Sequence, residues 1–131
     1  MTRYLTIPQL LFIHARLIDE TGGAHGLRDL GALKAASARP QATFANQEMY
    51  PDLFSKAAAL LDSLVNNHPF IDGNKRTGIT AAGLFLRQNG YRLTATNPEL
   101  EAFTLAVATQ RQDIAELTPW LQAHSTPSKE P

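Results

Sequence analysis

A short stretch of the sequence, from His68 to Arg76, places five polar or ionisable side chains within nine residues. His68 can accept a proton from a hydroxyl group, because a neutral imidazole is the commonest general base in proteins. Asp72 can bind a divalent cation, and Lys75 and Arg76 can neutralise phosphate oxygens. These residue types together favour a reaction on a phosphate group.

The local sequence predicts a turn that holds these side chains beside the start of a helix. Pro69 cannot extend a preceding helix, and Gly73 can take a positive φ. A helix that begins near Asn74 leaves its first backbone N–H groups unpaired and directed toward the turn, where the helix dipole also attracts anions. Lys75 adds a point charge, and Arg76 adds a planar group that can bind two oxygens at once.

A carboxylate within a phosphate site calls for a metal ion. Asp72 is suited to Mg²⁺, because Mg²⁺ commonly uses one or two carboxylates together with the oxygens of substrate phosphates. His68 follows the preceding helix, and the positive end of the next helix favours its neutral, basic form. Phe70 has no chemistry of its own, and we expect it to point into the core and anchor the turn.

Each of these residues also has an ordinary structural interpretation. A single histidine after a helix is often a cap or a surface residue, and Asp-Gly-Asn is a common turn sequence. The combination favours function, because Lys75 and Arg76 at a helix N-terminus cost stability unless an anion offsets their charge. The other histidines, His14, His25 and His124, lack metal-ligand spacing and are predicted to be structural or exposed.

The surrounding sequence predicts an all-α domain, a compact bundle of about six helices with one small β-hairpin. Caps and apolar residues at helical spacing indicate helices near 6–20, 29–38, 51–66, 76–89, 97–107 and 113–121. Pro119 is expected to kink or restart the last helix. The stretch 41–50 has no helical period and predicts the hairpin, with Asn46 in its turn. We expect one domain over residues 1–124 and a disordered tail over residues 125–131.

The overall composition is that of a single globular domain. The 131 residues are 44% hydrophobic and 18% charged, which suits one hydrophobic core. The 12 basic and 12 acidic residues balance, which argues against direct nucleic-acid binding and against a nuclease. The absence of cysteine excludes disulfides and thiolate chemistry. With no apolar run of membrane-spanning length and no recognisable signal peptide, we expect a cytoplasmic protein without membrane association.

The stretch from His68 to Arg76 also fits the pattern His-x-Phe-x-(Asp/Glu)-Gly-Asn-x-Arg of the Fic/Doc superfamily. The pattern is met by His68, Phe70, Asp72, Gly73, Asn74 and Arg76. The segments "GGAHGLRD", "ARPQ", "YPDLFSKAAALL" and "LFLRQNGYRL" extend the resemblance over most of residues 4–122. Within the superfamily, the sequence resembles the death-on-curing (Doc) toxins of toxin–antitoxin systems.

The resemblance implies a mostly helical fold and a nucleoside triphosphate, ATP, as a substrate. It implies His68 as the general base, Asp72 as the Mg²⁺ ligand, and Phe70 as an anchor. Gly73 and Asn74 would form an anion hole, and Lys75 and Arg76 would contact phosphates. The hairpin residues would form a flap that aligns a target segment, which assigns this role to Thr43, Phe44, Ala45 and Asn46.

Two departures from the pattern of AMP-transferring Fic enzymes bear on the reaction. Lys75 stands where those enzymes have a second glycine, and Ile79 stands where they have a second arginine. The lysine is shared with Doc toxins, and the resemblance therefore implies transfer of the terminal phosphate of ATP to a serine or threonine hydroxyl of a translation elongation GTPase. A Phd-like antitoxin would be the partner that controls such a toxin.

Two alternatives stay open at this point. One is an AMP transferase with an atypical motif, which would adenylylate a protein hydroxyl. The other is a catalytically inactive module that binds an antitoxin or regulates expression. Intact His68, Asp72 and Arg76 favour an active enzyme over the second alternative.

Overall fold

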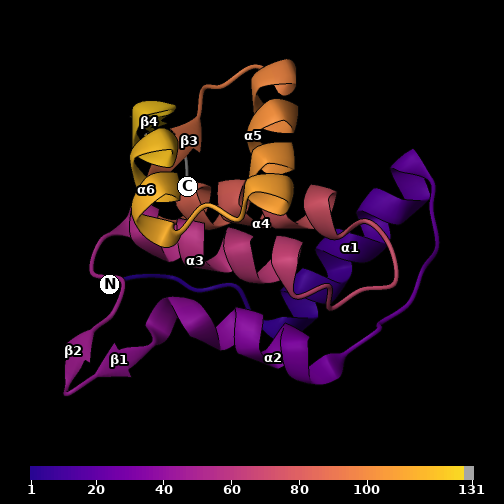
Figure 1. The fold of residues 1–131 in the computed structure, drawn as a ribbon, viewed down its shortest axis with the longest axis horizontal. Helices are drawn as coiled ribbons and strands as arrows, with labels where there is room; N and C mark the ends of the chain where they lie inside the picture. Colours follow the sequence, from indigo (N-terminus) through magenta and orange to yellow (C-terminus); the bar gives the residue numbers. More distant parts are fainter. Residues whose placement is uncertain (129–131) are drawn as a thin grey trace.

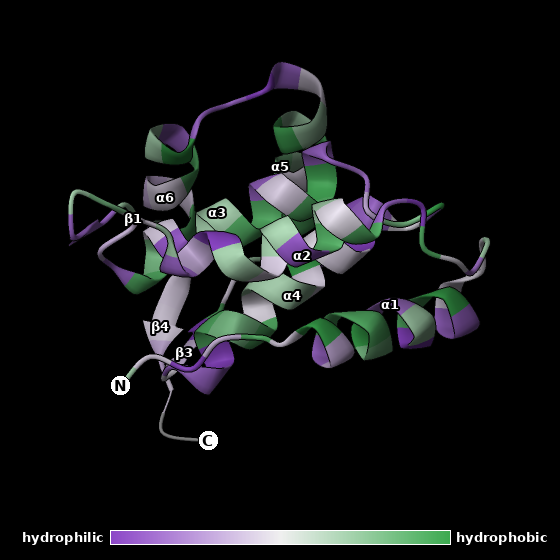
Figure 2. Ribbon diagram, turned by 90° about the horizontal axis from the view of Figure 1, so that it is seen from below, coloured by the Kyte–Doolittle hydropathy of each residue, from purple (hydrophilic) through white to green (hydrophobic). Residues whose placement is uncertain are grey.

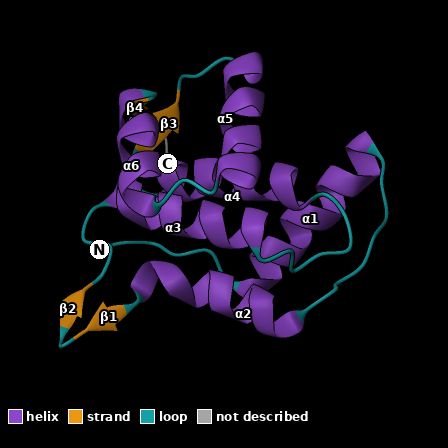
Figure 3. Ribbon diagram, viewed as in Figure 1, coloured by secondary structure: helices purple, strands orange, loops and turns teal. Residues whose placement is uncertain are grey.

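The computed structural model describes residues 1–128, and within them the chain forms six α-helices and two small two-stranded sheets (Figure 1). The helices are α1 (Ile7–Thr21), α2 (Leu30–Ala38), α3 (Leu53–Asn66), α4 (Asn74–Gln88), α5 (Asn97–Gln110) and α6 (Ile114–Ala123). The other elements are a 3₁₀ turn η1 (Arg39–Gln41) and the strands β1 (Thr43–Phe44), β2 (Gln47–Glu48), β3 (Tyr91–Leu93) and β4 (Ser125–Pro127). Figure 3 shows how far helix dominates, so the expected helical bundle with a small hairpin is confirmed.

Local capping signals set the start of most helices. Reciprocal side-chain and backbone hydrogen bonds begin α1, α3, α5 and α6, at the caps Thr6, Asp52, Thr96 and Asp113. Each cap satisfies backbone N–H groups that the helix leaves unpaired. One prediction needs correction: α6 runs through Pro119 from Ile114 to Ala123 and does not restart there.

Helices α3 and α4 lie side by side in opposite directions at the centre of the bundle (Figure 1). Helix α1 packs on α4, α2 packs on α3, and α5 and α6 stand on the opposite side from α2 (Figure 1). The two central helices approach closely at Gly78, where an added Cβ would lie 2.7 Å from Cγ2 of Val65. Phe70 and Phe85 are the largest fully buried side chains of the core.

The predicted hairpin is confirmed as β1 and β2, which pair antiparallel with Phe44 opposite Gln47. Its turn residues Ala45 and Asn46 have φ values of 51° and 64°, the left-handed conformation that a two-residue hairpin turn requires. Lys56, only 2% exposed on α3, anchors the hairpin. Its ammonium group donates to Glu48 Oε1 at 2.9 Å and to the backbone carbonyl of Tyr50.

The C-terminal segment differs from the expected disordered tail. Residues Ser125–Pro127 form β4, which pairs antiparallel with β3 and places Thr126 opposite Arg92. Thr94 N–H donates to the carbonyl of His124 at 2.7 Å and extends the pairing. The strands are paired by backbone hydrogen bonds, so the polar side chains of residues 125–127 did not predict a strand. The expectation for residues 129–131 lies outside the described residues.

The outer helices carry mixed surfaces. Figure 2 shows hydrophilic and hydrophobic residues distributed around α1. Phe12 of that helix is 63% exposed. Among the described residues, no helix is both long and apolar enough to cross a membrane.

Candidate active site

The loop between α3 and α4, residues 67–73, carries the first half of the His68 motif and is called the α3–α4 loop below, and the second half begins α4. Phe70, 1% exposed, lies in the core as expected, and its role as an anchor of the loop stays a prediction. The side-chain amide of Asn74 closes the loop, because its Oδ1 accepts from Phe70 N–H at 3.0 Å and its Nδ2 donates to Phe70 O at 2.9 Å. The Asn74 side chain therefore shapes the loop, and its second amide N–H stays available to a ligand.

The start of α4 leaves backbone N–H groups available for an anion. The first helical hydrogen bond runs from Thr77 N–H to Gly73 O at 2.9 Å, and no side chain caps the helix. The N–H groups of residues 74–76 thus have no helical partner. Gly73 has φ of 75°, and an added Cβ would lie 3.0 Å from Ile18 Cδ1, so both conformation and space favour glycine.

The Asp72 carboxylate is oriented by two backbone donors. Its Oδ2 accepts from Ala24 N–H at 3.1 Å, and its Oδ1 accepts from Gly73 N–H at 2.8 Å. These two hydrogen bonds, together with the charges of Arg76 and His14, hold the pKa of the Asp72 carboxyl below its ordinary value. Asp72 is therefore ionised at neutral pH, and each oxygen keeps acceptor capacity for a further ligand.

The residues present fit a magnesium ion most of whose ligands would be oxygen atoms of a substrate. Within the described residues, no group of three His, Asp, Glu or Cys side chains could hold a metal. Asp72 is instead a single ionised carboxylate in the same loop that leads to the free N–H groups of α4. Mg²⁺ is commonly bound by one or two carboxylates with phosphate oxygens and water, which matches this donor set.

His68 has an unusual backbone conformation and an uncommitted ring. Its φ is 47°, in the left-handed region that residues with a Cβ seldom adopt. The residue is exposed, and its ring forms no hydrogen bond to any residue that the structure describes. Its ring nitrogens are thus available to a substrate hydroxyl, as a general base requires.

Lys75 and Arg76 line a cavity between the start of α4 and the helix α5. The cavity has a volume of about 680 Å³. Its other lining residues are Thr21, Ile79, Thr80, Asn97, Leu100, Glu101, Thr104 and Leu105. The Arg76 guanidinium donates to the hydroxyl of Thr21 at the end of α1. The structure therefore places two cations of the motif in the lining of a cavity of ligand size.

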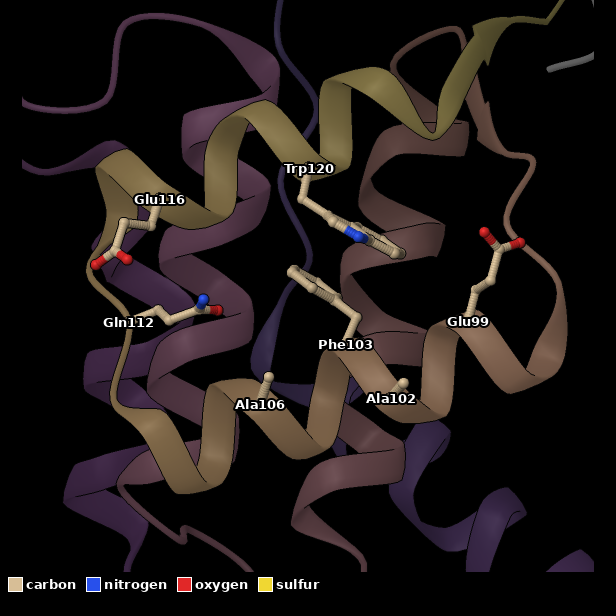
Figure 4. A pocket seen from close by; sticks show the side chains of 7 residues that line it. All are labelled: Glu99, Ala102, Phe103, Ala106, Gln112, Glu116 and Trp120. Atoms are coloured by element: carbon tan, nitrogen blue, oxygen red, sulfur yellow. The ribbon is translucent and has the colours of Figure 1, made fainter.

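A second cavity lies between α5 and α6 and is drawn in Figure 4. It has a volume of about 360 Å³, and Phe103 stacks there on Trp120 at 3.8 Å between ring centroids. Two carboxylates, Glu99 and Glu116, border it, and no residue from His68 to Arg76 does, whereas Lys75 and Arg76 line the first cavity. We therefore assign the chemistry to the cavity beside Lys75.

His14 supports the site as a buried structural residue, which is one of the two roles that the sequence indicated. It is 4% exposed, and its ring stacks on Phe70 with centroids 3.8 Å apart. Its Nε2 lies 2.8 Å from the carbonyl oxygen of Asp72 and must donate, because a carbonyl only accepts. His14 is one helical turn from the buried residues Leu10 and Ile18, and this spacing was the available signal.

The segment Gly22–Asp29 is a further feature of the site, whose position the sequence did not indicate. We call it the clamp segment. It runs antiparallel to the α3–α4 loop, with Leu27 opposite Phe70 and a hydrogen bond from Ile71 N–H to Gly26 O at 3.0 Å. Its glycines allow this close approach, because a Cβ on Gly23 would lie 2.6 Å from Asp72 Oδ2.

The hairpin residues Thr43 to Asn46 are not brought to the site. The hairpin precedes α3, whereas His68 follows it, and α3 has 14 residues. At 1.5 Å per residue the helix separates the two by about 20 Å. The hairpin and the α3–α4 loop accordingly lie toward opposite ends of the long axis in Figure 1 and in Figure 2. The segment beside the loop is the clamp segment, and alignment of a target by the hairpin stays a prediction.

This helical bundle, with the His68 motif at the start of its central helix, is the fold that the sequence predicted. A sequence model of the Fic/DOC family matches residues 4–86, well over half of the chain. The chain belongs to the Fic/DOC family.

Two curated relatives are similar to the chain. It is 55% identical to "Toxin Doc" of Mycolicibacterium smegmatis over 74 residues, which cover 56% of this chain and 57% of that toxin. It is 34% identical to "Protein kinase doc" of Escherichia phage P1 over 120 residues, which cover 92% of this chain and 94% of that kinase. The matched region thus spans little more than half of the first relative and nearly all of the second.

Proposed function

We propose that the chain is the toxin of a toxin–antitoxin pair and a protein kinase, which transfers the terminal phosphate of ATP to a serine or threonine hydroxyl of a translation elongation GTPase. The single observation that carries the proposal is the uncommitted ring of His68 in the loop that leads to the unpaired N–H groups of α4. The names of the two relatives, a toxin and a kinase, support the same activity.

The residues divide the reaction into binding and proton transfer. Lys75, Arg76 and the N–H groups at the start of α4 bind phosphate oxygens and neutralise their charge. A magnesium ion held by Asp72 would supply further charge neutralisation on the phosphates. This suits phosphoryl transfer, which asks a protein mainly for positioning and electrostatic stabilisation.

His68 takes the proton in the chemical step. As the target hydroxyl oxygen forms its bond to the γ-phosphorus, the bond from that phosphorus to the β–γ bridging oxygen breaks, and ADP leaves with the electron pair. The hydroxyl proton passes to the His68 ring, whose nitrogens have no competing hydrogen bond within the described residues. Water can later remove the proton, because the residue is exposed.

Lys75 and Ile79 support γ-phosphate transfer over AMP transfer. Both residues line the 680 Å³ cavity. A lysine side chain there occupies space that a glycine would leave for an internal phosphate, and isoleucine at position 79 removes a second guanidinium. The chain therefore has one arginine where AMP-transferring Fic enzymes have two.

The test compares ATP labelled on the α phosphate with ATP labelled on the γ phosphate. Wild-type protein is incubated with Mg²⁺ and a purified bacterial translation elongation GTPase, and label from γ alone is expected on the GTPase. His68→Ala should lower the rate by about 10²- to 10⁴-fold. His124→Ala, at the end of α6, is the control and should retain the wild-type rate. Expression in bacteria should arrest growth for the wild type and for the control only.

The other outcomes correspond to the alternatives. Label from the α phosphate would identify an AMP transferase. No label from either position, with equal growth arrest by wild type and His68→Ala, would identify an inactive or regulatory module. Label on a different protein of a whole-cell extract would keep the kinase and reject the GTPase as its target.

The proposal includes a Phd-like antitoxin and action in the cytoplasm, where the target is found. A toxin of this kind needs an inhibitor, and a helix laid into an apolar groove is a common mode of recognition. A groove of about 330 Å³ between α1 and α4 has that character, with Phe12 and Leu84 exposed on its sides. Phe12→Ser should weaken antitoxin binding and leave phosphate transfer unchanged, as measured by calorimetry and by the labelling assay.

A further inference from the structure

Arg28 of the clamp segment donates hydrogen bonds to three consecutive carbonyl groups around His68. Its Nε donates to the carbonyl of His68 itself, and its Nη2 donates to the carbonyl of Asn67 at 2.8 Å. Its backbone N–H donates to the carbonyl of Pro69 at 2.8 Å. One residue, 40 positions away from His68 in the sequence, thus binds the backbone before, at and after the proposed base.

These carbonyls need an external donor because of where they lie. Asn67 is the C-cap of α3, and the chain reverses at once toward the buried Phe70. The last carbonyls of a helix have no intrahelical partner. His68 must also hold φ at 47° without the freedom of glycine, a conformation that persists only where its surroundings impose it.

We propose that Arg28 is a positioning residue, which holds the backbone of His68 in the left-handed conformation and so directs its free ring toward the phosphate site. The inference rests on the proposed function for its catalytic consequence. The planar guanidinium suits the task, because Nε and Nη2 lie in one plane and reach two successive carbonyls at once. A misplacement of about 1 Å in a reacting group can cost on the order of 100-fold in rate.

A direct contact between Arg28 and a phosphate is the competing explanation. The geometry favours positioning, because both nitrogens on one edge of the guanidinium are already bound to carbonyl oxygens. The Asp29 carboxylate, 4.0 Å from Arg28 Nη2, also offsets part of its charge. The two explanations predict different kinetics.

The experiment uses the full chain with Arg28→Lys and Arg28→Ala, and Arg16→Ala as a matched control. Arg16 is an exposed arginine of α1 that pairs with Glu20 at 2.8 Å. Initial rates with γ-labelled ATP, Mg²⁺ and the purified elongation GTPase give kcat and the KM for ATP. The φ angle of His68 is measured without substrate, from crystal structures or from the NMR coupling between its Hα and the carbonyl carbon of Asn67. Thermal unfolding shows which variants are folded.

Positioning predicts that kcat falls on the order of 10- to 100-fold in both Arg28 variants, with the KM for ATP within about twofold of wild type. The positioning role also predicts that His68 loses its positive φ in both Arg28 variants. Arg16→Ala should match the wild type in each measurement. If Arg28→Ala does not fold, Arg28→Lys alone decides, since it keeps the charge and most of the side chain.

Three results would overturn the inference. The first is an unchanged kcat. The second is full activity in Arg28→Lys with a raised KM for ATP in Arg28→Ala, which would show a contact with the nucleotide. The third is a positive φ of His68 retained in both variants. If wild-type protein transfers no phosphate, the proposed function fails, and the φ measurement still decides whether Arg28 holds His68.

Discussion

The ring of His14 lies flat on the ring of Phe70, with centroids 3.8 Å apart and planes 4° apart, and its Nε2 donates to the carbonyl of Asp72 at 2.8 Å. One side chain of α1 thus contacts both the buried ring of Phe70 and the backbone of Asp72, the proposed metal ligand. The loop is therefore positioned by tertiary contacts on two sides, by α1 and by the clamp segment.

Replacing His14 should separate the two contacts. His14→Phe keeps an aromatic ring on Phe70 but leaves the Asp72 carbonyl without its donor, which should cost about 1–3 kcal/mol of unfolding free energy. His14→Ala also removes the stacked ring and should cost more, about 3–5 kcal/mol by analogy with large-to-small core changes. Urea unfolding measures both. Equal stability of His14→Phe and wild type would show that the hydrogen bond contributes nothing.

The stability of the protein should depend on Asp72 in acid. The pKa of this carboxyl is lowered in the folded state, chiefly by the Ala24 and Gly73 N–H groups. The stabilisation is present above the unfolded pKa of about 3.9 and is lost as pH falls through the lower folded pKa. Melting temperatures measured from pH 7 to about pH 2.5 should therefore fall less steeply in Asp72→Asn than in wild type. Parallel curves would contradict the expectation.

Two neighbouring glycines offer a matched pair of substitutions. Gly22 and Gly23 both have positive φ, of 86° and 114°, but only a Cβ on Gly23 would meet Asp72 Oδ2, at 2.6 Å. Gly22→Ala should cost roughly 1–3 kcal/mol from backbone strain and keep its kcat. Gly23→Ala should show similar strain and also lose activity, since the carboxylate must move. Unfolding curves and labelling rates measure the two effects separately, and equal activity of the two variants would argue against a fixed Asp72.

Lys75 is expected to lower the unfolding free energy of the protein and to strengthen its binding of ATP. It is exposed in the first turn of α4, where a positive charge opposes the helix dipole. Lys75→Glu should therefore raise the unfolding free energy by about 0.3–1 kcal/mol at low salt, while it weakens ATP binding strongly. Calorimetry with ATP and Mg²⁺ alongside urea unfolding tests both signs. A destabilised variant would mean that Lys75 has a structural role in the folded protein.

Local signals in the sequence predicted much of the fold. Thr6, Asp52 and Asp113 cap helices because a cap and its partner lie three residues apart, within the reach of pattern analysis. The hairpin turn at Asn46 and the reversal at Gly73 follow from conformational preferences of single residues. The candidate site residues from His68 to Arg76 were likewise visible, since they lie within nine positions.

The contacts that position those residues depend on partners distant in the sequence. His14 is 58 residues from Asp72, Ala24 is 48 residues from it, and Arg28 is 40 residues from His68. The same holds for β4, which is held by backbone groups of β3. Helical period and capping determine the secondary structure of a segment. The packing of α1 and α2 against α3 and α4 determines which segments are in contact. That packing brought the clamp segment to the α3–α4 loop and left the hairpin beyond the far end of α3, because a rigid helix of 14 residues separates its two ends.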